Sequence, residues 1–280
     1  MNNDYIYIDE NEGKSKDNTR QAKFKVSKTS KVEYLINEME YDKALTLIDE
    51  MIDDNGKDYV ILNLKAIIMD KLSEYEKSIE YFDKALELCE NDEIKLNKSN
   101  ALYRWAKITY FPKGDYEKAL KLINDALKSI PKSEDPSEYY FLKGEILEAL
   151  GDLIEAKKSY LVAYKEFDKL DEFEKQTQYL NETNDVLINI TGGYYYNFSP
   201  NNGQIVELVQ EPDNEHDPDA IAVYLDGEKV GYVANSTYTL FKGFKNATQI
   251  KGLNPKKAVI LFVYLDEYIV AKLLDSWTLN

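Results

Sequence analysis

One short motif recurs between residues 41 and 157 and constrains the fold more than any other feature. Its four versions are Tyr41-Asp42-Lys43-Ala44-Leu45, Tyr75-Glu76-Lys77-Ser78-Ile79, Tyr116-Glu117-Lys118-Ala119-Leu120 and Leu153-Ile154-Glu155-Ala156-Lys157. The small residues at the fourth position are separated by 34, 41 and 37 residues. Repeats of this length are typical of helical hairpins that stack in a row, because each hairpin buries its apolar face only against its neighbours.

The first interval and the pattern of small residues resemble the tetratricopeptide repeat (TPR). Its period is 34 residues, and the longer intervals leave extra residues for loops around 111–115 and 132–136. Small residues such as Gly144 and Ala156 let the two helices of a unit approach closely, and larger ones such as Tyr160 fill the seam. The resemblance covers about half the chain and implies four units, of which the first is the weakest.

From about residue 185 the pattern changes to short alternating runs between turn residues. Candidate strands are 186–191, 204–209, 220–224, 229–233, 259–265 and 268–273. Asp226-Gly227 and Asp266-Glu267 are expected to form tight hairpins, and a short helix is expected after Asn235, which is followed by helix-capping residues. So many short strands close most simply as a small, mostly antiparallel barrel.

Three motifs in this second region resemble a HIRAN domain. Residues 211–223 read Glu-Pro-Asp-Asn-Glu-His-Asp-Pro-Asp-Ala-Ile-Ala-Val and match the family's acidic-Pro-x-Asn-x-x-Asp-x-x-Ala-Ile-x-Val motif. Residues 229–233 (Lys-Val-Gly-Tyr-Val) match its Val-Gly strand, and residues 192–196 (Gly-Gly-Tyr-Tyr-Tyr) match its glycine-led aromatic segment. The resemblance implies an OB-like barrel that recognises single-stranded DNA, in the best understood members at a free 3′ end.

Those members carry the domain beside a Swi/Snf-type helicase motor and act in replication-fork remodelling, which implies a place in DNA repair. This chain has no Gly-x-x-x-x-Gly-Lys-Ser/Thr loop for nucleotide phosphates, so no ATPase activity is expected from it.

The expected DNA-binding residues are Tyr195, Tyr196, Asn214, His216, Asp217 and Tyr232. The two adjacent tyrosines offer ring faces for terminal bases, and the Asn214 amide offers a donor and an acceptor. His216 stands where the family often has an aromatic residue, and Tyr232 lines the same predicted pocket. The Asp217 carboxylate is expected to accept a hydrogen bond from a 3′-hydroxyl and to repel a 3′-phosphate.

Each of these residues also has a purely structural interpretation. Residues 194–196 are compatible with a single strand whose side chains are alternately buried and exposed. The Asp217 side chain is compatible with capping a turn, and the Asn214 amide with hydrogen bonds to the loop backbone. Lys229, Lys242 and Lys245 are the candidate phosphate contacts. The family usually has a basic residue where this chain has tyrosine at position 194.

The charge balance of the chain excludes some classes of function. Thirty-five Lys and Arg stand against 51 Asp and Glu, a net charge of −16, which excludes a uniformly basic nucleic-acid surface. One histidine and one cysteine, Cys89, support neither a disulfide framework nor a convincing catalytic set. We expect no metal, no cofactor and no enzymatic activity. The polar segment 1–20 and the lack of a long apolar run predict a cytoplasmic protein that does not contact membranes.

The sequence therefore predicts a multidomain chain, α then β. The expected parts are a disordered tail (1–27), a TPR-like solenoid (28–184) whose last helix, 165–180, caps its end, and a HIRAN-like β domain (185–280). The residues predicted to line the peptide groove of the repeats are Asn63, Lys95, Lys98 and Phe141.

Two functions follow from this organisation. The first is a non-enzymatic adaptor that binds single-stranded DNA through the barrel and a protein or peptide through the groove. The alternative is a scaffold that binds only proteins.

Overall fold

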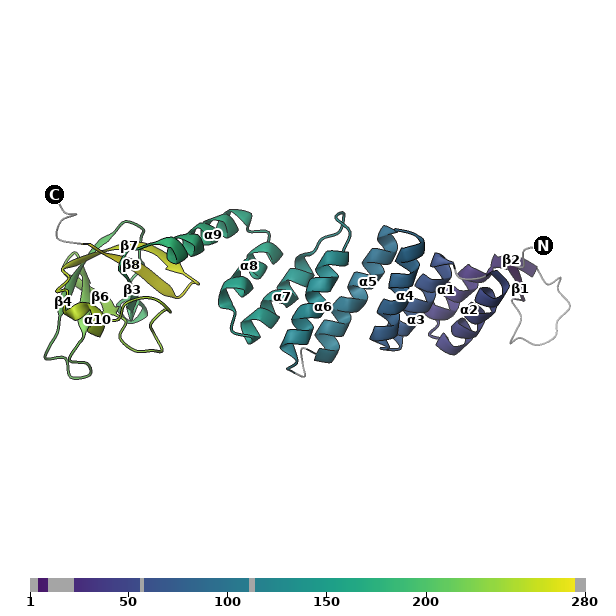
Figure 1. Ribbon diagram of the computed structural model, residues 1–280, viewed down its shortest axis with the longest axis horizontal. Helices are drawn as coiled ribbons and strands as arrows, with labels where there is room; N and C mark the ends of the chain where they lie inside the picture. The colour runs from purple at the N-terminus through teal and green to yellow at the C-terminus, as the bar shows by residue number, and fades with distance from the viewer. Residues whose placement is uncertain (1–4, 10–22, 56–57, 111–113, 275–280) are drawn as a thin grey trace. The chain divides into compact units, whose positions relative to one another are not determined.

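The computed structural model describes residues 5–9, 23–55, 58–110 and 114–274 (Figure 1). The chain forms two compact units, Met1–Lys165 and Glu166–Asn280. No helix among the described residues is long and apolar enough to cross a bilayer.

The first unit contains four consecutive helical hairpins, as the repeat pattern predicts (Figure 1). The helices are α1 (Lys28–Asn37), α2 (Tyr41–Asn55), α3 (Tyr59–Lys71), α4 (Tyr75–Leu88), α5 (Asp92–Arg104), α6 (Tyr116–Ser129), α7 (Ser137–Ala149) and α8 (Leu153–Ala163). At Gly144 of α7, an added Cβ atom would lie 2.6 Å from Cε1 of the Tyr160 ring on α8. The buried Ser78 hydroxyl donates to the Ala66 carbonyl across the α3–α4 seam at 2.9 Å. Small side chains therefore set the close approach of the paired helices.

Part of the long interval of the third repeat is helical, ahead of the loop predicted around residues 111–115. Helix α5 continues as a π-helical segment, η1 (Trp105–Tyr110), before residues 111–113, which lie outside the described residues. The buried Trp105 ring stacks on Tyr75 at 5.9 Å between centroids, and Lys118 lies over it at 5.9 Å. Burial of this large ring stabilises the extra turn as helix.

The N-terminal segment also differs from the predicted disordered tail. Strands β1 (Tyr5–Asp9) and β2 (Lys23–Ser27) pair antiparallel, with Tyr5 opposite Ser27. The aromatic and β-branched residues that dominate β1 favour a strand. The rest of the predicted tail, 1–4 and 10–22, lies outside the described residues.

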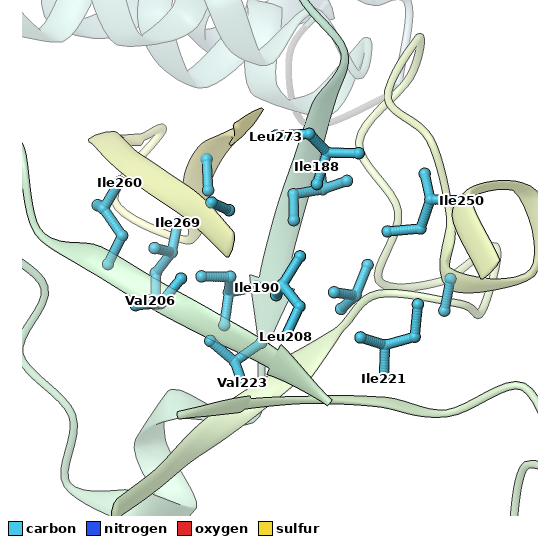
Figure 2. Close-up of a cluster of buried hydrophobic side chains, with 14 of the residues drawn as sticks. Ile188, Ile190, Val206, Leu208, Ile221, Val223, Ile250, Ile260, Ile269 and Leu273 are labelled. Carbon is cyan, nitrogen blue, oxygen red and sulfur yellow. The ribbon is translucent and has the colours of Figure 1, made fainter. Parts of the chain in front are cut away.

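The second unit contains a closed antiparallel barrel with strand order β3-β6-β5-β4-β7-β8. Its strands are β3 (Leu187–Thr191), β4 (Ile205–Gln210), β5 (Ile221–Leu225), β6 (Glu228–Val233), β7 (Lys257–Tyr264) and β8 (Tyr268–Leu274). All six predicted strands are confirmed, with ends shifted by at most two residues. Figure 2 shows the aliphatic core inside the barrel, where Ile188, Ile190, Val206 and Leu208 point toward one another.

In both hairpins the turn residues have the left-handed backbone conformation, with positive φ, that tight turns require. Asp226 and Gly227 have φ values of 52° and 85°, which confirms the predicted β5–β6 turn. Between β7 and β8 the left-handed residues are Leu265 and Asp266, one position before the predicted pair.

The short helix of the barrel begins later than the sequence indicates. Residues after Asn235 form turns, and α10 (Ala247–Lys251) begins at Asn246. The Asn246 side chain accepts from the Gln249 backbone N–H at 2.8 Å, and the Gln249 side chain accepts from the Asn246 N–H at 3.0 Å. This capping box determines where the helix starts.

Helix α9 (Phe167–Glu182) is part of the second unit, although the sequence suggests a cap of the repeats. The Phe173 ring stacks on Tyr264 of β7 at 5.0 Å, and Thr177 Oγ1 lies 2.8 Å from the Tyr264 hydroxyl. Tyr179 packs edge-on against Phe262 at 6.2 Å. Helix α9 therefore groups with the barrel. The amphipathic pattern of a helix indicates which of its faces is apolar, but it does not indicate which element packs against that face.

Candidate nucleic-acid interface

Two exposed tyrosines lie on a short 3₁₀ helix, η3 (Gly193–Tyr196), directly after β3. Tyr194 and Tyr195 are 91% and 85% exposed, and their rings meet edge-on at 5.9 Å. Gly192, at φ 80°, ends the strand, so the interpretation of residues 194–196 as a strand is wrong. The structure thus leaves both ring faces open to solvent.

Beside η3, a polar cluster surrounds Tyr232 on β6. The Tyr196 ring lies 6.5 Å from the Tyr232 ring. Lys229 Nζ donates to Glu211 Oε1 at 2.5 Å and to the Tyr232 hydroxyl at 2.9 Å, while that hydroxyl donates to Glu211 Oε2 at 3.1 Å. The hydrogen bond from Lys229 lowers the pKa of Glu211, and the hydrogen bond to Glu211 raises the pKa of Lys229. Lys229, an expected phosphate contact, is therefore already paired with a carboxylate.

The loop between β4 and β5 uses its motif residues to hold its own backbone. Asn214 Oδ1 accepts from the backbone N–H groups of His216 and Asp217 at 3.0 and 3.2 Å. Asp217 Oδ1 accepts from the Asp219 N–H at 2.9 Å, and Oδ2 accepts from Asn235 Nδ2 at 2.8 Å. These contacts match the structural interpretation of Asn214 and Asp217. Each carboxylate oxygen has two lone pairs, so Asp217 retains acceptor capacity.

Asn235 connects this loop to α10, a role that the sequence does not reveal. Its Oδ1 accepts from the Thr248 N–H at 3.0 Å, in the first turn of the helix. Asp219 accepts from the Thr248 hydroxyl at 2.8 Å and pairs with Lys251 at 2.7 Å, and the Lys251 hydrogen bond lowers the pKa of Asp219. The motif loop is therefore fixed at both ends.

His216 lies exposed at the surface of this loop. Among the described residues, no group of three or more His, Cys, Asp or Glu side chains is arranged to hold a metal ion.

A further exposed aromatic residue, Tyr238, was not among the predicted site residues. It is 93% exposed in the loop that joins β6 to α10, and Lys242 and Lys245 are exposed in the same loop. The buried Asn189 holds this loop: its Nδ2 donates to the Thr239 carbonyl at 2.7 Å, and its Oδ1 accepts from the Phe241 N–H at 3.1 Å. An isolated tyrosine between turn residues gives no signal in the sequence.

The repeats carry a separate cavity of about 500 Å³ lined by α1, α3 and the start of α5. Of the four residues predicted for the groove, Asn63 lines this cavity. Lys95 pairs with Glu90 and Asp92, Lys98 pairs with Asp83, and Phe141 packs against Tyr160 and Tyr164. The structural equivalent of Asn63 on α5 is Asn97, 34 residues later, whose Nδ2 lies 3.4 Å from Asn63 Oδ1.

Comparisons with known proteins agree with this architecture. The family model of the HIRAN domain matches residues 184–247, and a tetratricopeptide repeat model matches 60–92 and 137–167. A TPR repeat-containing protein of Methanocaldococcus jannaschii is 24% identical over 140 residues, which are 48% of this chain and only 23% of that protein.

Among solved structures, MamA AMB-1 is 15% identical with a TM-score of 0.33, covering 50% of this chain and 75% of that one. A MamA RS-1 double mutant is 17% identical with a TM-score of 0.35, covering 54% and 94%. The two family models therefore identify tetratricopeptide repeats, at residues 60–92 and 137–167, followed by a HIRAN domain at residues 184–247.

Proposed function

We propose that this protein is a non-enzymatic adaptor that binds single-stranded DNA at a free 3′ end and a protein partner in its repeats. HIRAN domains suggest DNA binding and tetratricopeptide repeats suggest protein interaction. The observation that carries the DNA-binding part is the exposed pair Tyr194 and Tyr195, immediately beside the Tyr196–Tyr232 contact.

Ring stacking accounts for binding on a surface with few free cations. Stacking of a base on an aromatic side chain is worth roughly 1–3 kcal/mol and tolerates any base. Lys242 and Lys245 are exposed, and neither has an ion-pair partner among the described residues. They are the phosphate contacts of this proposal, in place of Lys229.

Selection for a 3′-hydroxyl follows from the carboxylates of the motif loop. Asp217 is half-buried, and Glu211 lies in the same loop, bonded to Asn214 at 3.1 Å. A terminal hydroxyl can donate to Asp217, whereas a terminal phosphate would place two negative charges in close contact.

The protein partner occupies the cavity between α1 and α3 in this proposal. Val60, Leu64 and Ile67 of α3 supply apolar surface there, and Asn63 and Lys71 supply polar groups. A peptide with one or two apolar anchors and free backbone groups matches this lining.

The test is fluorescence anisotropy of the full chain with three labelled strands of equal length. One strand ends in a 3′-hydroxyl, one ends in a 3′-phosphate and one is circular. We expect the first to bind most tightly, and Tyr195→Ala to weaken its binding roughly tenfold. Tyr34→Ala, at an exposed tyrosine of α1, is the matched control and should leave binding unchanged.

Asp217 is tested with the same strands. Asp217→Asn should reduce the preference for the hydroxyl over the phosphate, whereas Asp213→Asn, an exposed neighbour in the loop, should not. Equal binding of all three strands by the wild type would refute end recognition.

The second candidate is a scaffold that binds only proteins. The Lys229–Glu211 ion pair favours it, because it removes the charge nearest to the tyrosines. If no strand binds even at low salt, the DNA-binding part is refuted and this candidate replaces it.

A further inference from the structure

A cavity of about 200 Å³ has Tyr194 in its lining and no residue of the Asp217 loop. It lies between η3, the loop that carries Thr239, and the β7–β8 turn. Its volume equals roughly seven water molecules at about 30 Å³ each. A single heterocyclic base fits a space of this size.

Three aromatic residues form part of the cavity wall. Tyr194, Phe198 and Tyr268 line it. The Tyr268 ring packs edge-on against Phe241 at 5.0 Å, and the Phe198 N–H donates to the Gly193 carbonyl at 3.0 Å. Aromatic rings in a cavity wall favour a planar ring system.

One carboxylate gives the cavity its charge. Of the described residues that line it, only Glu267 carries a charge. Burial and then the charge of Glu267 raise the pKa of Tyr268, which places that charge close to the ring wall. The lining thus has an acceptor for N–H groups and no cation for a phosphate. The exposed Lys242 and Lys245 lie in the loop that supplies Thr239, outside the lining.

We infer that this cavity is a nucleobase subsite in which Glu267 accepts a hydrogen bond from an exocyclic amino group. A carboxylate accepts from N4 of cytosine, whereas thymine offers a carbonyl oxygen at that position. The subsite therefore favours cytosine over thymine. The inference rests on the proposed DNA binding and adds a base preference to it.

The experiment compares anisotropy of the full chain with oligo-dC and oligo-dT of equal length, both with a 3′-hydroxyl. Mildly alkaline buffer keeps cytosine unprotonated. We expect dC to bind roughly fivefold to tenfold more tightly than dT. Glu267→Ala should remove this preference without abolishing binding. Glu228→Ala, which removes an exposed carboxylate at the opposite hairpin, should retain it.

The outcomes separate this inference from the proposed function. Failure of both oligonucleotides to bind the wild type overturns DNA binding and the subsite together. Equal binding of dC and dT overturns the subsite alone. A dC preference that persists in Glu267→Ala, with an unchanged thermal unfolding curve, assigns the preference elsewhere and also overturns it.

Discussion

At the scale of single residues, the repeat period predicts contacts as well as helices. Two pairs of equivalent residues, 34 positions apart, meet between α3 and α5: Asn63 with Asn97, and Asp70 with Arg104. Arg104 bonds Asp70 in a bidentate arrangement, with Nη2–Oδ2 at 2.5 Å and Nε–Oδ1 at 3.2 Å. The Asp70 side chain is 5% exposed and that of Arg104 is 42% exposed.

Because of this asymmetry in burial, we expect the two residues of the ion pair to differ in how much stability is lost when each is removed. Arg104→Ala leaves a buried carboxylate without its partner and should lower the free energy of unfolding by about 3 kcal/mol. Asp70→Ala leaves the Arg104 cation, which reaches water, and should therefore lower the free energy of unfolding by a smaller amount. Urea unfolding of both variants is the measurement, and an equal or reversed order would contradict the assignment.

The Glu211–Lys229 pair makes the stability of the barrel depend on pH. Because the folded-state pKa of Glu211 lies below its ordinary value of 4.5, its contribution is fully present above that value and is lost as pH falls through the lowered pKa. Glu211→Gln should therefore reduce the amount of stability that the full chain loses as the pH falls through the acidic range. Asp213→Asn, in the same loop, should leave the loss of stability at acidic pH unchanged. Thermal unfolding followed across the acidic range provides the measurement.

At the scale of elements, the position of helix α9 is determined by its packing against the barrel. Its Phe173 and Thr177 contact Tyr264, a fully buried residue of β7. The barrel is therefore expected to need this helix to cover Tyr264.

Two fragments test that dependence. Residues 166–280 should unfold at a higher temperature than residues 185–280, because the shorter fragment exposes the Tyr264 ring. In the longer fragment, Phe173→Ala should cost about 3 kcal/mol. The exposed Phe167 on the same helix is the matched control, and Phe167→Ala should cost far less. Identical melting of the two fragments would show that α9 does not stabilise the barrel.

At the scale of the whole molecule, a net charge of −16 limits how DNA binding can occur. Because Lys229 pairs with Glu211 and Lys251 pairs with Asp219, the proposal assigns the exposed Lys242 and Lys245 to phosphates.

Binding should consequently show a shallow salt dependence. Two phosphate contacts on a single strand give a slope of log K against log salt of about −1.4. Changing both lysines to glutamine should bring this slope close to zero, while Lys256→Gln, an exposed lysine outside this loop, should not alter it. A much steeper slope would indicate phosphate contacts that the proposal does not include.

The sequence by itself determined the order of the two parts, the four helical hairpins and all six barrel strands. Period and alternation reflect which face of an element is buried, and this information is local. The tertiary structure alone decided the partner of α9 and the hydrogen bond between Asn235 and Asp217. It also brought Glu267 and Thr239 to one cavity beside Tyr194. These features depend on contacts between residues far apart in the chain, which a pattern of neighbouring residues does not encode.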